Sequence, residues 1–129
     1  MTSIIAERGG IYNWTGGSKN PNATFTRCLV VSGDSRSEDA MISVLFLYDG
    51  HGKGLDCVDF SIDGEIFHVH AEMITYTARS LLLSKIMQIS DDKMDKIDLI
   101  MRKAIGLDVE GSVYKELYDD LVGRMVKGA

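Results

Sequence analysis

The chain has 129 residues, with 14 Lys and Arg against 19 Asp and Glu, a net charge of -5, and a sequence pI of about 5.1. Binding to duplex nucleic acid needs a basic face that displaces counterions, so this charge argues against such a partner, and the 45% hydrophobic content is typical of one globular domain. No stretch reaches the ~18 apolar residues of a membrane span and the start lacks a signal-peptide pattern, so we expect a cytoplasmic domain with no membrane association and two reduced thiols, Cys28 and Cys57.

Glycines separate short β-like runs at the start of the chain. Residues 3–7 and 11–14 have strand character, and residues 16–23 have the composition of a loop. Tyr12 and Trp14 therefore stand beside glycines. Aromatic side chains in such a setting either form a stacking platform for a ligand or cover part of a sheet, and the sequence leaves both alternatives open.

Two strands are predicted at residues 24–32 and 40–48, which are rich in β-branched and aromatic residues. The second is apolar on both faces, because Ile42 and Val44 alternate with Met41 and Leu45. Both faces must then be covered. We expect either the N-terminal segment or a second subunit to cover the face away from the helices, and the second case would make the protein a homo-oligomer.

Residues 55–73 predict a β-hairpin. Asp63-Gly64 supplies the positive φ angles of a type I′ turn, and a two-residue turn fixes the register of the strands. The preceding segment 49–54, DGHGKG, opens a strand rather than a helix, so it is interpreted as a hairpin connection and not as a phosphate loop. The predicted pairs are Ile62 with Glu65, Phe60 with Phe67 and Val58 with Val69 on one face, and Ser61 with Ile66, Asp59 with His68 and Cys57 with His70 on the other.

From residue 74 the apolar period changes from two to about 3.6, which predicts three helices. The first covers residues 75–90, the second runs from Ser90 to Gly106, and the third ends near Lys127. The expected fold class is α+β in a single domain, residues 1–129. An antiparallel β-meander of four to six strands (1–73) is followed by three C-terminal helices (74–129) packed on one face.

The polar face of the predicted hairpin carries a thiol, a carboxylate and two imidazoles. Cys57, Asp59, His68 and His70 are all zinc-ligand types, and paired strand positions bring them close together. Alternating polar residues are also what a solvent-facing sheet requires, and Asp opposite His is a favourable pair on its own. We therefore expect no cofactor, with zinc as the alternative.

A ligand surface is predicted on the side of the sheet without helices. The charge of Arg27, within an otherwise uncharged strand, needs a carboxylate such as Asp59 or an anionic ligand. His51, at the tip of a glycine-rich loop, can reach toward the hairpin. The predicted ligand-binding residues are Tyr12, Trp14, Arg27, His51, His68 and His70, and no residue is assigned a catalytic role.

No hydrolase motif, Walker loop or dinucleotide fingerprint is present, and a flat sheet face lacks the cleft of an enzyme. The sequence is therefore interpreted as a non-catalytic binding protein. It would act by sequestration or inhibition of a protein or of a small anionic or nucleotide-like ligand, in the class of phage inhibitors and immunity proteins. The alternative is a metal-binding protein or small hydrolase centred on Cys57, Asp59, His68 and His70.

Overall fold

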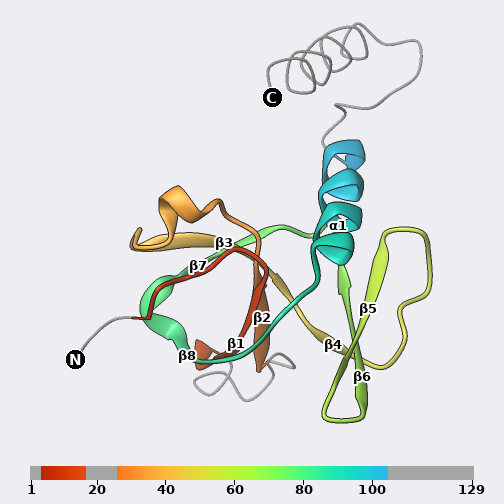
Figure 1. The fold of residues 1–129 in the computed structure, drawn as a ribbon, viewed down its shortest axis with the longest axis horizontal. Helices are drawn as coiled ribbons and strands as arrows, with labels where there is room; N and C mark the ends of the chain where they lie inside the picture. Colours follow the sequence, from red (N-terminus) through yellow and green to blue (C-terminus); the bar gives the residue numbers. More distant parts are fainter. Residues whose placement is uncertain (1–3, 17–25, 105–129) are drawn as a thin grey trace, which may run out of the picture.

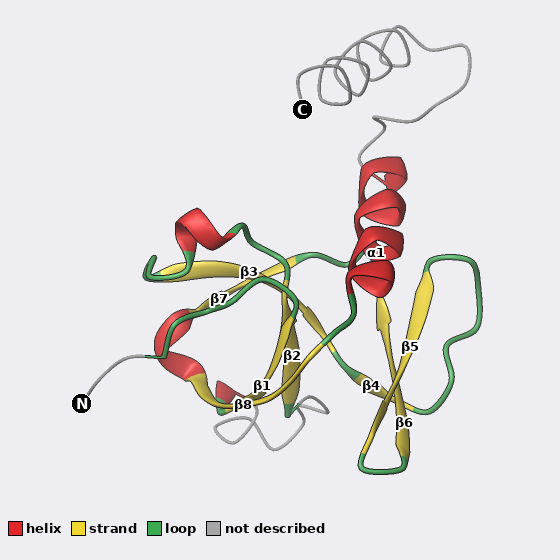
Figure 2. Cartoon of the chain, viewed as in Figure 1, coloured by secondary structure: helices red, strands yellow, loops and turns green. Residues whose placement is uncertain are grey.

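The computed structural model describes residues 4–16 and 26–104, which form two antiparallel sheets and one α-helix (Figures 1 and 2). The first sheet, in the order β7-β3-β2-β1-β8, contains β1 (Gly10–Trp14), β2 (Arg27–Val30), β3 (Met41–Phe46), β7 (Thr75–Ala78) and β8 (Leu82–Gln88). The second, in the order β4-β6-β5, contains β4 (Tyr48–Asp49), β5 (Cys57–Ile62) and β6 (Glu65–His70). The helix is α1 (Asp91–Ala104), and two 3-10 turns are η2 (Asp34–Arg36) and η3 (Arg79–Leu81). Within these ranges, no helix has the length and apolar character needed to cross a membrane.

The hairpin prediction is confirmed. Asp63 and Gly64 have φ angles of 50° and 82°, the positive values that a type I′ turn needs at both central positions. All six predicted pairs occur between β5 and β6, from Ile62 with Glu65 to Cys57 with His70. The interpretation of residues 49–54 as a hairpin connection is wrong, because β4 and β5 pair with opposite edges of β6 rather than with each other.

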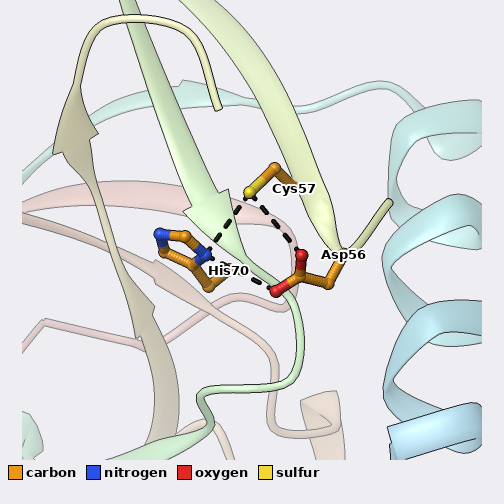
Figure 3. A group of neighbouring side chains, drawn as sticks. All are labelled: Asp56, Cys57 and His70. Atoms are coloured by element: carbon orange, nitrogen blue, oxygen red, sulfur yellow. Dashed lines mark hydrogen bonds and ion pairs between the residues drawn. The ribbon is translucent and has the colours of Figure 1, made fainter. Parts of the chain in front are cut away.

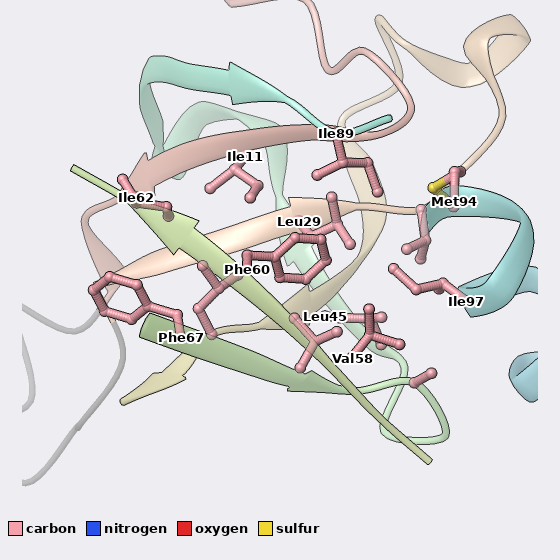
Figure 4. Close-up of a cluster of buried hydrophobic side chains, with 14 residues drawn as sticks. Ile11, Leu29, Leu45, Val58, Phe60, Ile62, Phe67, Ile89, Met94 and Ile97 are labelled. Carbon is pink, nitrogen blue, oxygen red and sulfur yellow. The ribbon is translucent and has the colours of Figure 1, made fainter. Parts of the chain in front are cut away.

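The main core lies between the two sheets and is closed by α1 (Figure 4). Phe60 and Val58 of β5 meet Leu29 of β2, and Ile97 of α1 enters from the side (Figure 4). Each large apolar side chain buried here contributes about 1.5–3 kcal/mol relative to exposure. The buried members are Ile11, Leu29, Val31, Leu45, Leu47, Val58, Phe60, Ile62, Phe67, Val69, Ala71, Ile89, Met94 and Ile97.

A smaller core covers the other face of the first sheet. Its buried members are Ala6, Tyr12, Cys28, Val30, Ile42, Val44 and Leu82. Strand β3 is therefore covered on both faces, with Leu45 in the main core and Ile42 in the smaller one. The expectation that the N-terminal segment packs on this second face is confirmed by Ala6, which is fully buried, and by Ile4, which packs against the cluster. The homo-oligomer remains a prediction.

The predicted fold class is wrong: in place of one meander followed by three helices, the described residues form a five-stranded sheet, a three-stranded sheet and one α-helix. Residues 75–78 and 82–88 are strands β7 and β8, so two strands at opposite ends of the first sheet occupy the place of the first predicted helix. The cause is an irregular pairing of β8 with β1, whose register shifts twice and breaks the period of two. The second predicted helix is present as α1, with Asp91 and Asp92 in its first turn. The third lies outside the described residues.

Candidate functional site

The outer face of the second sheet, turned away from the main core, carries three packed rings. His68 and His70 alternate on β6 with the core residues Phe67 and Val69, so both imidazoles project from this face. Tyr48 pairs with His68 across β4 and β6, and the two rings stack with their centroids 5.5 Å apart. The His70 ring lies edge-on to both, with centroids 5.0 Å from each. We call Tyr48, His68 and His70 the ring cluster.

The position of the proton on neutral His68 follows from its hydrogen bond. Nδ1 lies 2.8 Å from the carbonyl oxygen of Gly50, and because a carbonyl only accepts, Nδ1 must donate. The neutral ring therefore carries its proton on Nδ1 and presents an unprotonated Nε2. Among the described residues no group bonds to Nε2. His68 is thus oriented to accept a proton from a bound molecule.

His51 joins this face through Asp59, as the sequence suggested. Its Nδ1 lies 2.8 Å from Oδ2 of Asp59, and the backbone N–H of Gly52 donates to Oδ1 at 2.9 Å. These hydrogen bonds, that of Gly52 first and that of His51 second, lower the pKa of the Asp59 carboxyl. The carboxylate is therefore ionised above its unfolded pKa of about 3.9, and its contribution to stability is lost only as the pH falls through the lower folded value.

Gly52 brings the loop against the sheet. A Cβ atom on Gly52 would lie 2.3 Å from Cβ and 2.9 Å from Sγ of Cys57, and 3.3 Å from Cβ of His68. Real Cβ atoms do not approach that closely, so the position requires glycine. The close approach is what sets the Gly52 N–H and the His51 ring against Asp59.

Replacing Gly52 with alanine is expected to push the loop off the sheet and break the hydrogen bonds to Asp59. The overpacking should lower the free energy of unfolding by about 1–3 kcal/mol, measurable by urea denaturation. Gly33→Ala is a matched control, because a Cβ there meets only Ser35 Oγ at 3.9 Å. Equal effects from the two substitutions would show that the approach of Gly52 to Cys57 is not a constraint.

Arg27 lies on the opposite face of β6 from His68. Its guanidinium carbon is 5.0 Å from the centre of the Phe67 ring, a cation–π contact. Neither Asp59, the carboxylate suggested by the sequence, nor any other acidic side chain within 4–16 and 26–104 forms an ion pair with it. Its backbone carbonyl accepts from Leu47, the residue before Tyr48, so Arg27 stands next to the β3–β4 junction.

Tyr12 and Trp14 cover part of the first sheet, which is one of the two alternatives that the sequence left open. Tyr12 is 1% exposed in the smaller core, and its hydroxyl donates to the carbonyl of Ile5. Trp14 is half-buried, donates from Nε1 to Thr77 Oγ1 at 2.9 Å, and packs on Phe46 with ring centroids 4.6 Å apart. Phe46 in turn lines a pocket of about 240 Å³ together with Tyr48, His70, Met73 and Thr75. Trp14 therefore packs against the smaller core, and only Phe46 separates it from the pocket beside the ring cluster.

The four residues suggested as metal ligands do not converge on one centre. Asp59 is held by His51, and His68 is held by the Gly50 carbonyl. Cys57 Sγ instead lies 3.3 Å from Nδ1 of His70, and Asp56 approaches both (Figure 3). Burial raises the pKa of the Cys28 thiol to about 12 and also raises the pKa of the Cys57 thiol, but only Cys57 is partly exposed.

Sequence reasoning missed Tyr48, Gly52 and Asp56. The position of Tyr48 depends on β4 pairing with β6, and strand order leaves no local signal in a sequence. Asp56 precedes the paired residues of β5 and reaches His70 because the N–H of Ala71 donates to its carbonyl. The glycines at positions 52 and 54 could have indicated that this loop approaches another part of the chain closely. The sequence does not show that Gly52 approaches Cys57.

No family model and no curated protein sequence matches the chain. The fold of the chain does match those of solved structures. An endoribonuclease from a mycobacterial species aligns with a TM-score of 0.66 at 18% identity, over 84% of this chain and 99% of that one. An endoribonuclease in complex with its cognate antitoxin, also mycobacterial, aligns at 0.65 and 21% identity over 80% and 97%. MazF from Deinococcus radiodurans aligns at 0.63 and 13% identity over 79% and 97%.

The chain has the fold of the MazF toxins. This likeness overturns the interpretation as a non-catalytic protein that sequesters or inhibits a ligand, and also the alternative of a metal-binding protein or small hydrolase centred on Cys57, Asp59, His68 and His70. The structures that share the fold are described as endoribonucleases and toxins. The expectation that the protein is not an enzyme is contradicted by this likeness to structures described as endoribonucleases. That expectation treated the hairpin face as flat, whereas the 49–54 loop and strand β4 lie against it.

Proposed function

We propose that the protein is an endoribonuclease that cleaves single-stranded RNA at the outer face of the second sheet. One observation carries the proposal: His68 is fixed by Tyr48 and the Gly50 carbonyl with Nε2 presented for proton transfer. The MazF fold supports the same reaction by analogy, since it is shared with proteins described as endoribonucleases.

RNA supplies its own nucleophile, so the protein needs only to move protons and hold the phosphate. His68 Nε2 takes the proton of a ribose 2′-hydroxyl as its oxygen bonds to the adjacent phosphorus. The bond from phosphorus to the 5′-oxygen breaks, and that oxygen takes a proton from the protonated ring of His51. Asp59 holds His51 in orientation through Nδ1, the role that a carboxylate plays behind a histidine base. The products carry a 2′,3′-cyclic phosphate and a 5′-hydroxyl.

Arg27 is the proposed phosphate ligand. Its guanidinium is a five-donor fork suited to phosphate oxygens, and no carboxylate in the described part of the chain neutralises it. Arg27 lies on the opposite face of β6 from the ring cluster, next to the junction of β3 and β4. An RNA backbone that passes around the second sheet at this junction would contact both Arg27 and the ring cluster.

Base stacking would supply much of the affinity. The net charge of -5 disfavours broad electrostatic attraction to a polyanion. Exposed bases of single strands instead stack on aromatic rings at about 1–3 kcal/mol per base, and Tyr48 and His70, which line the pocket of about 240 Å³, offer such rings. Bases within a duplex are already stacked and cannot use this surface.

The proposal is tested with the purified full chain, a single-stranded RNA several hundred nucleotides long, and the same RNA annealed to its complement. We expect cleavage of the single strand and protection of the duplex. Equal cleavage of both would contradict the stacking surface, and no cleavage of either would contradict the proposed activity.

We also propose a protein partner. A mycobacterial endoribonuclease and the Deinococcus MazF were solved with an antitoxin and with MazE respectively. Among residues 4–16 and 26–104, β7 is an edge strand of the first sheet, where Tyr76 is 65% exposed and Met41 of the neighbouring strand 47%. An exposed edge strand with apolar side chains is suited to a second chain, either an antitoxin or another copy. The cytoplasmic location and the homo-oligomer are part of this proposal.

A further inference from the structure

We propose that Asp56, Cys57 and His70 form a zinc-binding site where β5 begins and β6 ends (Figure 3). It differs from the centre suggested by the sequence, since Asp59 and His68 are engaged elsewhere and Asp56 takes part. The site does not depend on ribonuclease activity.

The spacing of the donor atoms fits one zinc ion. With Zn–S near 2.3 Å and Zn–N or Zn–O near 2.0–2.2 Å, donors at tetrahedral corners lie roughly 3.4–3.6 Å apart. Cys57 Sγ and His70 Nδ1 are 3.3 Å apart, His70 Nδ1 and Asp56 Oδ2 are 3.5 Å apart, and Cys57 Sγ and Asp56 Oδ1 are 3.9 Å apart. The two carboxylate distances involve different oxygens. With one atom from each residue the three donors lie within 4.8 Å of one another, so the Asp56 carboxylate would turn to bring a single oxygen to the ion.

The backbone places these donors without a metal. Cys57 and His70 are directly opposite each other in the β5–β6 register, and the Ala71 N–H donates to the Asp56 carbonyl at 2.9 Å. The His70 ring is held edge-on against Tyr48 and His68, which keeps Nδ1 toward the thiol. Donors fixed by a strand register lose little conformational freedom when they bind an ion.

The surroundings also suit a cation. The carboxyl group of Glu72 contacts that of Asp56, so two acidic groups and a thiol gather at one point. Glu72 or water can complete a four-coordinate shell around an ion held by a thiolate, an imidazole and a carboxylate, the donor types that zinc accepts.

The test uses Co²⁺ alone as a spectroscopic substitute for zinc, with the full chain under reducing conditions. We expect tetrahedral d–d bands and a thiolate-to-cobalt charge-transfer band that saturate at one ion per chain, and displacement of the ion by Zn²⁺. Cys57→Ser should abolish the charge-transfer band, and Asp56→Asn should weaken Zn²⁺ binding by on the order of 100-fold, since losing even an outer hydrogen-bonding partner of a zinc ligand costs about 10–100-fold.

Glu38→Gln is the matched control, because it removes an exposed carboxylate from the segment between η2 and β3, outside the proposed site, and should leave binding unchanged. Octahedral bands without charge transfer in the unsubstituted protein would overturn the proposal. So would Zn²⁺ affinity that is equal in the Cys57→Ser, Asp56→Asn and Glu38→Gln variants. None of these readouts measures RNA cleavage, so failure of this site and failure of the proposed activity are distinguishable.

Discussion

Replacing His68 with asparagine is expected to lower the rate of RNA cleavage by about 10²–10⁴-fold, the usual contribution of a positioned acid or base. The asparagine amide can still donate to the Gly50 carbonyl from near the position of Nδ1, so the loop contact is retained. What disappears is Nε2, the atom that takes the 2′-hydroxyl proton. Initial rates on a fluorescent single-stranded RNA measure the effect.

The control for this variant is Glu65→Gln, an exposed change on the same hairpin that touches no ring of the cluster. Thermal unfolding should give similar midpoints for both variants. If the His68→Asn protein is folded and cleaves RNA at the rate of the control, His68 is not the base and the proposed mechanism is wrong.

Replacing Phe60 with alanine is expected to reduce the free energy of unfolding by about 3–5 kcal/mol. The ring is 2% exposed at the centre of the main core, and its removal leaves a cavity between the hairpin and the first sheet. Its face also carries the ammonium of Lys93, 4.9 Å from the ring centre, so a link to α1 is lost as well. The loss is a large share of the roughly 5–15 kcal/mol that stabilises a typical domain.

Urea denaturation measures this loss, with Leu55→Ala as the matched control. Leu55 is 97% exposed, so its truncation should change the free energy of unfolding by less than about 0.5 kcal/mol. A loss below about 1 kcal/mol for Phe60→Ala would mean that the two sheets do not pack through this ring.

The hairpin could be predicted to the residue because its signals are local. Asp63-Gly64 specifies the turn, the turn specifies the register, and the alternation of Val58, Phe60 and Ile62 specifies the buried face. Helix α1 was predictable for the same reason. Its acidic first turn and its buried Met94 and Ile97 lie within one continuous segment.

The segment from Thr75 to Gln88 was misread because bulges imitate a helical period. Between β1 and β8 the register shifts near Tyr12 and again before Trp14, so Leu82 reaches the smaller core while Ile86 and Met87 reach the main one. Apolar residues then recur every three or four positions, as on a helix. The partner strand that imposes these bulges is about 70 residues away in the sequence, which no local pattern reveals.

The candidate site was predictable in part. His68 and His70 share a face because they are two residues apart on a strand, and the loop carrying His51 was expected to reach them. Tyr48 and Asp56 were not predictable, because each depends on which strand lies beside β6. The sequence did not point to the proposed activity because the likeness to endoribonucleases lies in the fold, at 18% and 21% identity, rather than in a sequence motif.

The most direct test of the account is the chemistry of the cut itself. A cleavage site is first mapped on a long single-stranded RNA with the purified full chain, and an oligonucleotide of that sequence is then made with and without the 2′-hydroxyl next to the cleaved phosphate. The account predicts that the ribose form is cut to a 2′,3′-cyclic phosphate and a 5′-hydroxyl, and that the 2′-deoxy form is not cut. Equal cleavage of both forms, with no cyclic phosphate, would contradict it.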